Sequence, residues 1–393
     1  MNVLSRPARL WLPLLLSLPL AAQTAPQPEA PALAAPNPAE TTRLDPALAA
    51  NPAAATNLVW HDVTTWGVEG RAWTGQERLR WFDRFPAAAE KTVTSKVWNL
   101  SRDSAGMMVR FKTDATAIYV HYQLHKPGLA LSNMPATGVS GVDLYARNAS
   151  GQWRWVQVTK PETQEVRAEI IKNLAPGLRE YAAYLPLYNG VDSLEIGVPP
   201  GAAFEGLAPR ARPIVFYGTS ITQGAAASRP GMVHTAILGR RLERPVVNLG
   251  FSGNGRMDAA VGELLTQIDA AAYVIDCLPN MNPKLVTERC APLVQQIRAV
   301  KPDTPIILVE DRRFTNDWIV PNQARFHDAN HAALRAAFTT LQQAGVKHLF
   351  YIPGDHLYGD DAEGANDASH ASDLGFMRQA EVMEPILRAA LGQ

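Results

Sequence analysis

Two short motifs in the second half of the chain carry side chains suited to nucleophilic catalysis. Ser220 lies in the segment YGTSITQG, directly after an apolar run, and a serine hydroxyl becomes a nucleophile when a base lies beside it. His370 follows Asp367 by three residues in NDASHASDLG, and a carboxylate at that spacing can orient the imidazole and stabilise its charged form. Each motif alone has a simpler explanation, because serines often cap helices and Asp-x-x-His is common in solvated loops.

Two further motifs offer hydrogen-bond donors for a developing negative charge. The segment NLGFSGNG at 248–255 contains three glycines, whose backbone N–H groups could face such a charge. It lacks the Lys-Ser/Thr ending of a P-loop, and its glycine spacing does not fit a dinucleotide-binding fingerprint. The segment DCLPNM at 276–281 contains Asn280, whose amide could point to the same place, although an ordinary turn or capping asparagine is the alternative.

The elements that must position these motifs alternate between strands and helices from about Ala211 to Gln393. Short apolar runs lie at 213–217, 245–249, 273–278, 305–309 and 348–352, and helix-length segments lie near 230–243, 256–269, 284–300, 323–344 and 373–390. This alternation predicts a doubly wound parallel sheet covered on both faces. Ligands of such sheets bind beyond the carboxyl ends of the strands, and each motif follows one of the runs.

The preceding region, from Leu58 to about Leu207, has a different pattern. Short alternating segments suited to strands lie at 107–113, 116–124, 142–147, 152–158, 181–187 and 191–198, with turn residues between them. This spacing predicts an antiparallel β-sandwich of jelly-roll type. Seven tryptophans fall in the same region, and for any one of them a core position is a better interpretation than sugar stacking.

The four motifs, in the order Ser, Gly, Asn and Asp-x-x-His, resemble those of the SGNH/GDSL hydrolase superfamily, although its usual Gly-Asp-Ser reads Gly-Thr-Ser here. The phrase GVDLY at 141–145 resembles the GxDLY signature of an N-terminal β domain in one carbohydrate-esterase-like branch. The resemblance implies a flavodoxin-like three-layer fold for 211–393. It also implies that Ser220 is the nucleophile, His370 the general base and acid, and Asp367 the residue that orients His370.

The same resemblance implies an oxyanion hole. Its donors would be the Ser220 N–H, the Gly253 N–H and the Asn280 side chain. Gly253 is chosen because the family's oxyanion glycine follows the small residue of a Ser-Gly pair, and Gly250 is the alternative. The residues before Asn280 depart from the family's usual Gly-x-Asn-Asp, which leaves the direction of its amide open.

The N-terminus predicts export. Arg6 and Arg9 precede the apolar run Leu10–Leu20, and small residues follow, as in a cleavable signal peptide. The run is too short to span a bilayer. The predicted organisation is a signal peptide at 1–25, an Ala/Pro-rich linker at 26–57, the β domain at 58–207 and the hydrolase domain at 211–393, in a soluble periplasmic or secreted protein without stable membrane insertion.

Composition excludes several classes of function. The chain has 393 residues with 37 basic and 37 acidic side chains, which gives no electrostatic reason to bind nucleic acid or an anionic membrane. The two cysteines, Cys277 and Cys290, are expected to be free thiols, with a disulfide as the alternative. The acidic loop around His356 matches no metal motif, so neither a metal nor a cofactor is expected.

These observations predict an exported serine esterase. The expected substrates are short acyl esters, above all O-acetyl groups on carbohydrate. A lipid or thioester acylhydrolase with the same three residues is one alternative. A non-catalytic carbohydrate-binding protein that retains a degenerate hydrolase fold is the other.

Overall fold

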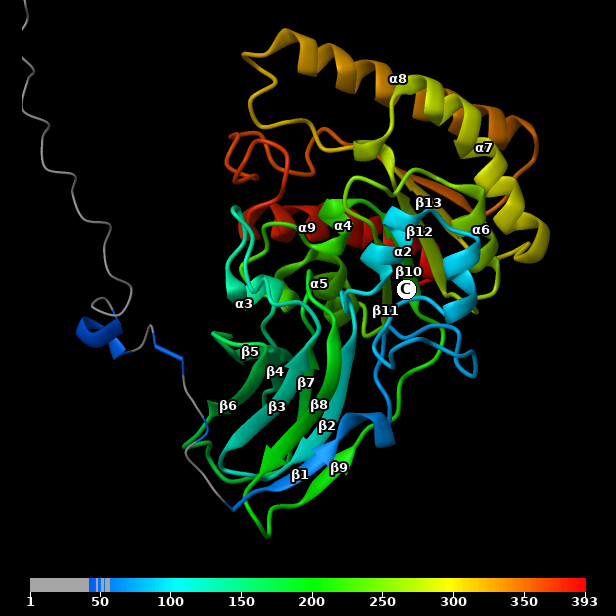
Figure 1. The fold of residues 1–393 in the computed structure, drawn as a ribbon. Coiled ribbons are helices and arrows are strands. Elements are labelled where there is room, and N and C mark those ends of the chain that lie inside the picture. The colour runs from blue at the N-terminus through cyan, green and yellow to red at the C-terminus, as the bar shows by residue number, and fades with distance from the viewer. Residues whose placement is uncertain (1–41, 47–48, 51–52, 54–56) are drawn as a thin grey trace, which may run out of the picture. The chain divides into compact units, whose positions relative to one another are not determined.

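The computed structural model describes residues 42–46, 49–50, 53 and 57–393 (Figure 1). The predicted signal peptide at 1–25 and most of the predicted linker at 26–57 lie outside the described residues. Contacts divide the chain into Met1–Ala49 and Ala50–Gln393, and the second unit contains every element discussed below. Within the described ranges, no helix combines the length and the apolar character needed to cross a membrane.

Five parallel strands form the sheet of the C-terminal region. They are β10 (Ile214–Gly218), β11 (Val246–Gly250), β12 (Ala272–Asp276), β13 (Ile306–Val309) and β14 (Leu349–Ile352). Their order, β11-β10-β12-β13-β14, is the flavodoxin-like order 2-1-3-4-5. The first four strands are buried along their whole length, which explains why their sequences are continuous apolar runs rather than alternating ones.

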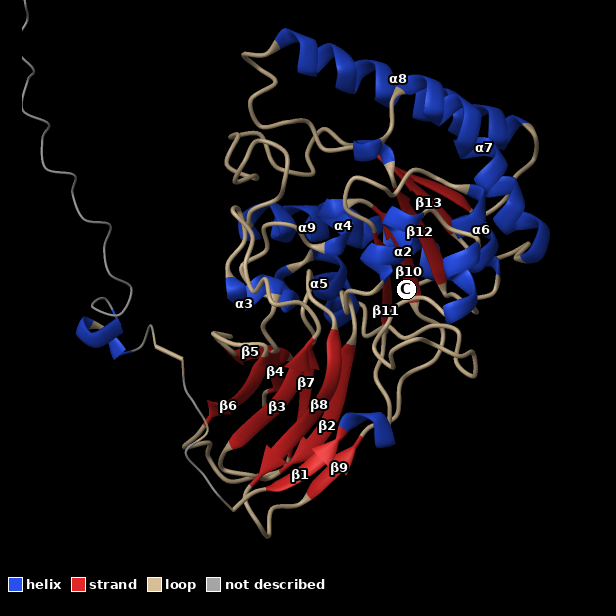
Figure 2. Ribbon diagram, viewed as in Figure 1, coloured by secondary structure: helices blue, strands red, loops and turns tan. Residues whose placement is uncertain are grey.

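Helices cover both faces of this sheet, as Figure 2 shows. The core on one face includes α5 (His234–Arg241) and α9 (Asp373–Leu391). The core on the other face includes α6 (Ala259–Thr266), α7 (Pro283–Val300) and α8 (Pro321–Gln343). The prediction of a doubly wound, three-layer α/β fold is confirmed.

The N-terminal region contains two antiparallel sheets. One has the order β1-β8-β3-β6 and the other β5-β4-β7-β2-β9. Their bounds are β1 Val59–Asp62, β2 Met108–Thr113, β3 Ile118–Leu124, β4 Asp143–Arg147, β5 Trp153–Val158, β6 Glu165–Ile171, β7 Arg179–Tyr184, β8 Val191–Val198 and β9 Phe204–Gly206. Alternate side chains of both sheets share one core, in which Val120 of β3 and Phe111 of β2 are buried. The antiparallel β domain is therefore confirmed, and its jelly-roll type stays a prediction.

Part of the N-terminal region packs against the core of the parallel sheet. This part includes a short 3-10 helix at Ala87–Lys91 and α2 (Ser95–Ser101), and its buried residues Trp73, Phe85 and Trp98 join the core of that sheet. Arg84 is also buried there and donates to the carbonyls of Asn248 (3.0 Å) and Gly250 (2.8 Å). Residues between β1 and β2 thus support the carboxyl end of β11.

Both cysteines are free and buried, as expected. Cys277 follows β12 and Cys290 lies in α7. Burial raises the pKa of both thiols, that of Cys290 to about 12, so neither forms a thiolate readily near neutral pH.

Candidate active site

Ser220 lies at the carboxyl end of β10, beside the point where the strand order reverses. The chain turns there into the short helix α4 (Ser220–Gln223), which Thr219 caps through its side chain. Gly218 makes this close turn possible, because a Cβ on it would lie 2.0 Å from the Thr222 hydroxyl. The strand end therefore places the Ser220 hydroxyl at the edge of the sheet where ligands bind.

The structure brings Ser220, His370 and Asp367 together. The Ser220 Oγ lies 2.9 Å from His370 Nε2, and His370 Nδ1 lies 2.8 Å from Asp367 Oδ2. The backbone N–H of His370 also donates to Asp367 Oδ1 at 2.7 Å. Since one carboxylate accepts from both the ring and the backbone of His370, it fixes the ring so that Nε2 faces the serine.

Asp367 is held in its ionised form by its hydrogen bonds. Burial favours the neutral acid, but donors from His370 and Asn133 outweigh that effect and lower the pKa of Asp367 to about 2. An ionised carboxylate only accepts, so His370 Nδ1 carries the proton and Nε2 has its lone pair toward Ser220. This is the tautomer that a general base requires.

Asn133 contributes to the site from the N-terminal region. It lies in the loop between β3 and α3 (Ala136–Val139), and its Nδ2 donates to Asp367 Oδ2 at 2.9 Å. The Asn366 side chain donates in return to the Asn133 carbonyl at 3.1 Å. Sequence reasoning missed this residue, since nothing in its local sequence marks it as a neighbour of Asp367.

The loop after β11 lies against the loop that carries Ser220. We call residues 251–255 the β11 loop. Its Phe251 N–H donates to the Gly218 carbonyl at 3.0 Å, and a Cβ on Gly255 would lie 1.8 Å from that same oxygen. Gly253 has a φ of +67° and is exposed, and no hydrogen bond within the described chain uses its N–H.

The alternative glycine, Gly250, is placed differently. It is the last residue of β11, it is buried, and its N–H donates to the Asn248 side chain at 2.9 Å. A substrate oxygen could not use that donor without breaking this bond. Of the two glycines, only Gly253 has an N–H that is exposed and available.

The hydrogen bonds of Asn280 indicate which way its amide faces. In one orientation its Nδ2 lies 3.4 Å from the Phe251 carbonyl. In the reversed orientation its oxygen accepts from the N–H groups of Asn254 (3.0 Å) and Gly255 (3.2 Å), which also donate to the Phe251 carbonyl. That orientation leaves the NH₂ group of Asn280 available as a donor, which is what an oxyanion hole needs. The unusual residues before Asn280 therefore do not prevent the amide from serving in that role.

The other histidine candidates lie elsewhere. His356 is exposed and pairs with Asp360 at 2.8 Å, in the acidic loop that the sequence indicated. His234 is fully buried, where desolvation lowers its pKa well below the usual value. Neither contacts Ser220 through a hydrogen bond in the described residues.

A buried cluster of Asp311, His327 and His331 was not predicted, and its ligand atoms lie close enough to hold a metal ion. The spacing of the two histidines on α8 was the available signal. However, the Phe314 N–H donates to His327 Nε2 (3.2 Å), so Nδ1 carries the proton and donates to Asp311 (2.9 Å). This tautomer satisfies His327 as a hydrogen-bond donor and does not favour metal binding through Nδ1.

Comparisons with known proteins identify the family. Residues 58–204 match the model of the N-terminus of SGNH-hydrolase-type esterases, and residues 211–388 match the GDSL-like lipase/acylhydrolase family. A solved GDSL-like lipase from Bacteroides ovatus is 33% identical, with a TM-score of 0.81, over 86% of this chain and 98% of that chain. This chain belongs to the GDSL-like lipase/acylhydrolase family.

More distant structures share the fold of this GDSL-family protein. The salicylyl-acyltransferase SsfX3 of a tetracycline biosynthetic pathway has a TM-score of 0.68 at 19% identity, over 86% of this chain and 98% of that one. An acetyl xylan esterase of Butyrivibrio proteoclasticus has a TM-score of 0.52 at 10% identity, over 86% and 99%. No curated protein matches the sequence.

The GVDLY phrase of this GDSL-family protein connects its two regions. Asp143 is fully buried and accepts from the Gly231 N–H (2.8 Å), from Arg229 (3.0 Å) and from the Trp155 indole (2.8 Å). Gly231 and Arg229 lie between α4 and α5, so this carboxylate fastens β4 to the segment that follows Ser220. The phrase is therefore a contact between the two regions, separate from the Ser220–His370–Asp367 contacts.

Proposed function

We propose that this protein is an exported serine esterase that hydrolyses short acyl esters, with O-acetyl groups on carbohydrate as the substrate class. The observation that carries the proposal is the continuous hydrogen-bond chain from Ser220 Oγ through His370 to Asp367. Family membership makes an ester or related acyl compound the expected substrate. Export rests on the signal-like residues 1–25.

The geometry leads to a two-step mechanism. His370 Nε2 removes the Ser220 proton as Oγ attacks the ester carbonyl, and Asp367 stabilises the imidazolium that forms. The carbonyl oxygen, now negative, accepts from the Ser220 N–H, the Gly253 N–H and the Asn280 amide. His370 gives its proton to the departing alcohol. A water molecule, deprotonated by His370, then attacks the acyl-serine, and the carboxylic acid leaves as Ser220 regains its proton.

The carbohydrate assignment rests on analogy. The solved structures with this fold include enzymes described as an acetyl xylan esterase and a family two carbohydrate esterase, and the N-terminal match belongs to SGNH-type esterases. A lipid acylhydrolase would share the same three residues and differ only in its preference for longer acyl chains. A binding protein would keep the fold without turnover.

One set of assays separates these functions. The wild type and Ser220→Ala are assayed on chromogenic esters from acetyl to long chains, and for acetate release from acetylated polysaccharide. We expect the highest rates on acetyl esters and complete loss in Ser220→Ala, with an unchanged circular dichroism spectrum. Rates that rise with chain length would favour a lipid substrate, and a folded Ser220→Ala with near wild-type turnover would overturn the proposal.

Histidine variants provide a matched control. His370→Ala removes the proposed base and should lower kcat by about 10⁴-fold or more. His356→Ala removes the exposed histidine of the acidic loop, and we expect it to keep wild-type kcat.

A further inference from the structure

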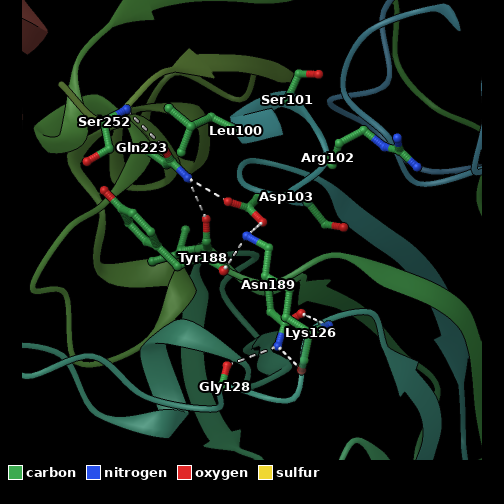
Figure 3. Close-up of polar contacts among 12 residues, drawn as sticks. Leu100, Ser101, Arg102, Asp103, Lys126, Gly128, Tyr188, Asn189, Gln223 and Ser252 are labelled. Carbon is green, nitrogen blue, oxygen red and sulfur yellow. Dashed lines mark hydrogen bonds and ion pairs between the residues drawn. The ribbon is translucent and has the colours of Figure 1, made fainter. Parts of the chain in front are cut away.

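Gln223 connects the proposed oxyanion hole to the N-terminal region. It is the last residue of α4, three positions after Ser220, and it is fully buried. Its Oε1 accepts from the Ser252 N–H of the β11 loop at 3.1 Å. Its Nε2 donates to Asp103 Oδ2 (3.2 Å) and to the Leu187 carbonyl (3.2 Å). Figure 3 shows Gln223 between Ser252 and Asp103.

The neighbours of Gln223 permit only one orientation of its amide. The Leu187 carbonyl and the Asp103 carboxylate, which forms an ion pair with Lys126, both accept hydrogen bonds, so the NH₂ end must face them. The carbonyl end must then face the Ser252 N–H. A reversed amide would set oxygen against two acceptors and NH₂ against a donor, and would leave buried groups without partners.

Asp103 is itself held in place by cations and backbone contacts. It is fully buried, and the Lys126 ammonium forms an ion pair with its carboxylate (Figure 3). Burial raises the pKa of Asp103, and the Lys126 charge opposes that shift. The buried Arg84 donates to the Asp103 carbonyl at 3.0 Å and also holds the end of β11. Asp103 is therefore a rigid acceptor for Gln223.

The β11 loop leaves one donor unused. Its Asn254 and Gly255 N–H groups donate to the Phe251 carbonyl (2.8 and 2.9 Å), and its Ser252 N–H donates to Gln223. Of the N–H groups at 252–255, only that of Gly253 has no acceptor in the described part of the chain. The bond from Ser252 to Gln223 holds the Phe251–Ser252 peptide, and the Asn254 side chain donates to the Ser252 carbonyl (2.7 Å), which shares its peptide plane with the Gly253 N–H. Gln223 therefore anchors the start of the turn that directs the Gly253 N–H.

We propose that Gln223 is a positioning residue for the Gly253 donor, and that the buried Asp103–Lys126 pair of the N-terminal region sets the orientation of its amide. The inference rests on the proposed esterase function, because Gly253 matters only if a negative oxygen forms beside Ser220. It gives the N-terminal region a part in catalysis that does not require contact with substrate.

Gln223→Met tests the proposal, since methionine has a similar shape and makes none of the three hydrogen bonds. We expect kcat to fall about 10- to 100-fold, while KM changes by no more than about threefold. This decrease in kcat is smaller than the decrease of about 10²–10³-fold that follows removal of an oxyanion donor itself. Binding of a boronic acid that mimics the tetrahedral intermediate should weaken by the same factor as kcat/KM.

Gln379→Met is the matched control. Gln379 is also fully buried with both ends bonded, to Arg312 (2.7 Å) and to the Gly375 carbonyl (3.2 Å), but it lies on α9. Loss of buried hydrogen bonds should lower the melting temperature in both variants. We expect only Gln223→Met to lose kcat and affinity for the boronic acid.

A second test uses two charge-changing substitutions, at Gln223 and at Asp103. It tests the positioning role of Gln223 even if Gln223→Met does not fold. Gln223→Glu places a carboxylate against Asp103 and should lower kcat. Adding Asp103→Asn gives the glutamate a donor and should restore part of the loss. Wild-type kcat and boronic acid binding in Gln223→Met, or no rescue by Asp103→Asn, would overturn the inference. Absence of Ser220-dependent turnover in the wild type would instead overturn the proposed function.

Discussion

At the scale of single residues, the site depends on short local spacings. Asp367 bonds both the ring and the backbone of His370 because three residues of turn bring them together. Asn280 reaches the β11 loop by a similar short turn after β12. The local turn sets the spacing of Asp367 and His370, whereas the direction of the Asn280 amide also depends on the β11 loop.

Asn280→Ala tests the third oxyanion donor. Because the amide should donate more strongly to the negative oxygen of the transition state than to substrate, we expect kcat to fall about 10²–10³-fold with little change in KM. Asn282→Ala is the control, since Asn282 caps α7 through its side chain. The control should lose about 1 kcal/mol of stability and keep its kcat. Equal kcat in the two variants would remove Asn280 from the oxyanion hole.

At the scale of elements, buried ion pairs connect α8 to the loop that follows β13. His331 on α8 lies 2.6 Å from Asp311 and 3.2 Å from Glu310, both of which follow β13. Burial would lower the pKa of His331, but hydrogen bonding to Asp311 and the charges of both acids outweigh it and raise that pKa. The raised pKa favours the charged form of this buried histidine beside the two acids.

This arrangement predicts how stability depends on pH. A histidine with a raised folded-state pKa stabilises the protein fully below its unfolded value of about 6.5, and the contribution is lost as pH rises through the folded value. We expect the urea unfolding free energy of the wild type to fall as the pH rises above about 6.5. His331→Asn should be destabilised by about 3 kcal/mol at pH 6 and show a flatter profile. An unchanged slope in His331→Asn would contradict this account.

At the scale of the whole molecule, the N-terminal region makes several hydrogen bonds to the segments that carry the site. Asn133 bonds Asp367, Asp103 bonds Gln223, and Asp143 accepts from the segment that follows α4. The first two contacts lie at opposite ends of the Ser220–His370–Asp367 arrangement. The two regions therefore share hydrogen bonds around the candidate site.

Asn133→Ala removes the contact with Asp367. One hydrogen bond contributes about 1 kcal/mol, so kcat/KM at pH 7 should fall about fivefold. The pKa of Asp367 should rise from about 2 toward its ordinary value, since one donor to the ionised form is lost. Carbon-13 NMR titration of the Asp367 carboxyl measures that shift. Asn133→Asp should raise the pKa further through like charge, and an unshifted titration in both variants would refute the role of Asn133.

Much of the fold was predictable because the signals are local. The strands β10 to β13 are fully buried and read as uninterrupted apolar runs, and their helices show the matching periodicity. β6 was not predicted, although charged Glu165, Arg167 and Glu169 alternate with apolar residues as in a half-buried strand. Residues such as Trp73 and Phe85 pack beneath a sheet that lies far along the chain, and no local pattern indicates that.

The sequence alone determined the order of strands and helices, the motifs at the strand ends and the family, because each depends on residue type and short spacing. Tertiary structure alone decided that Gly253 and not Gly250 has an available donor, that Gln223 fixes the β11 loop, and that Asn133 meets Asp367. The physical reason is that a hydrogen bond depends on the position of both partners within a few tenths of an ångström. For segments more than a hundred residues apart, only the packed core fixes those positions.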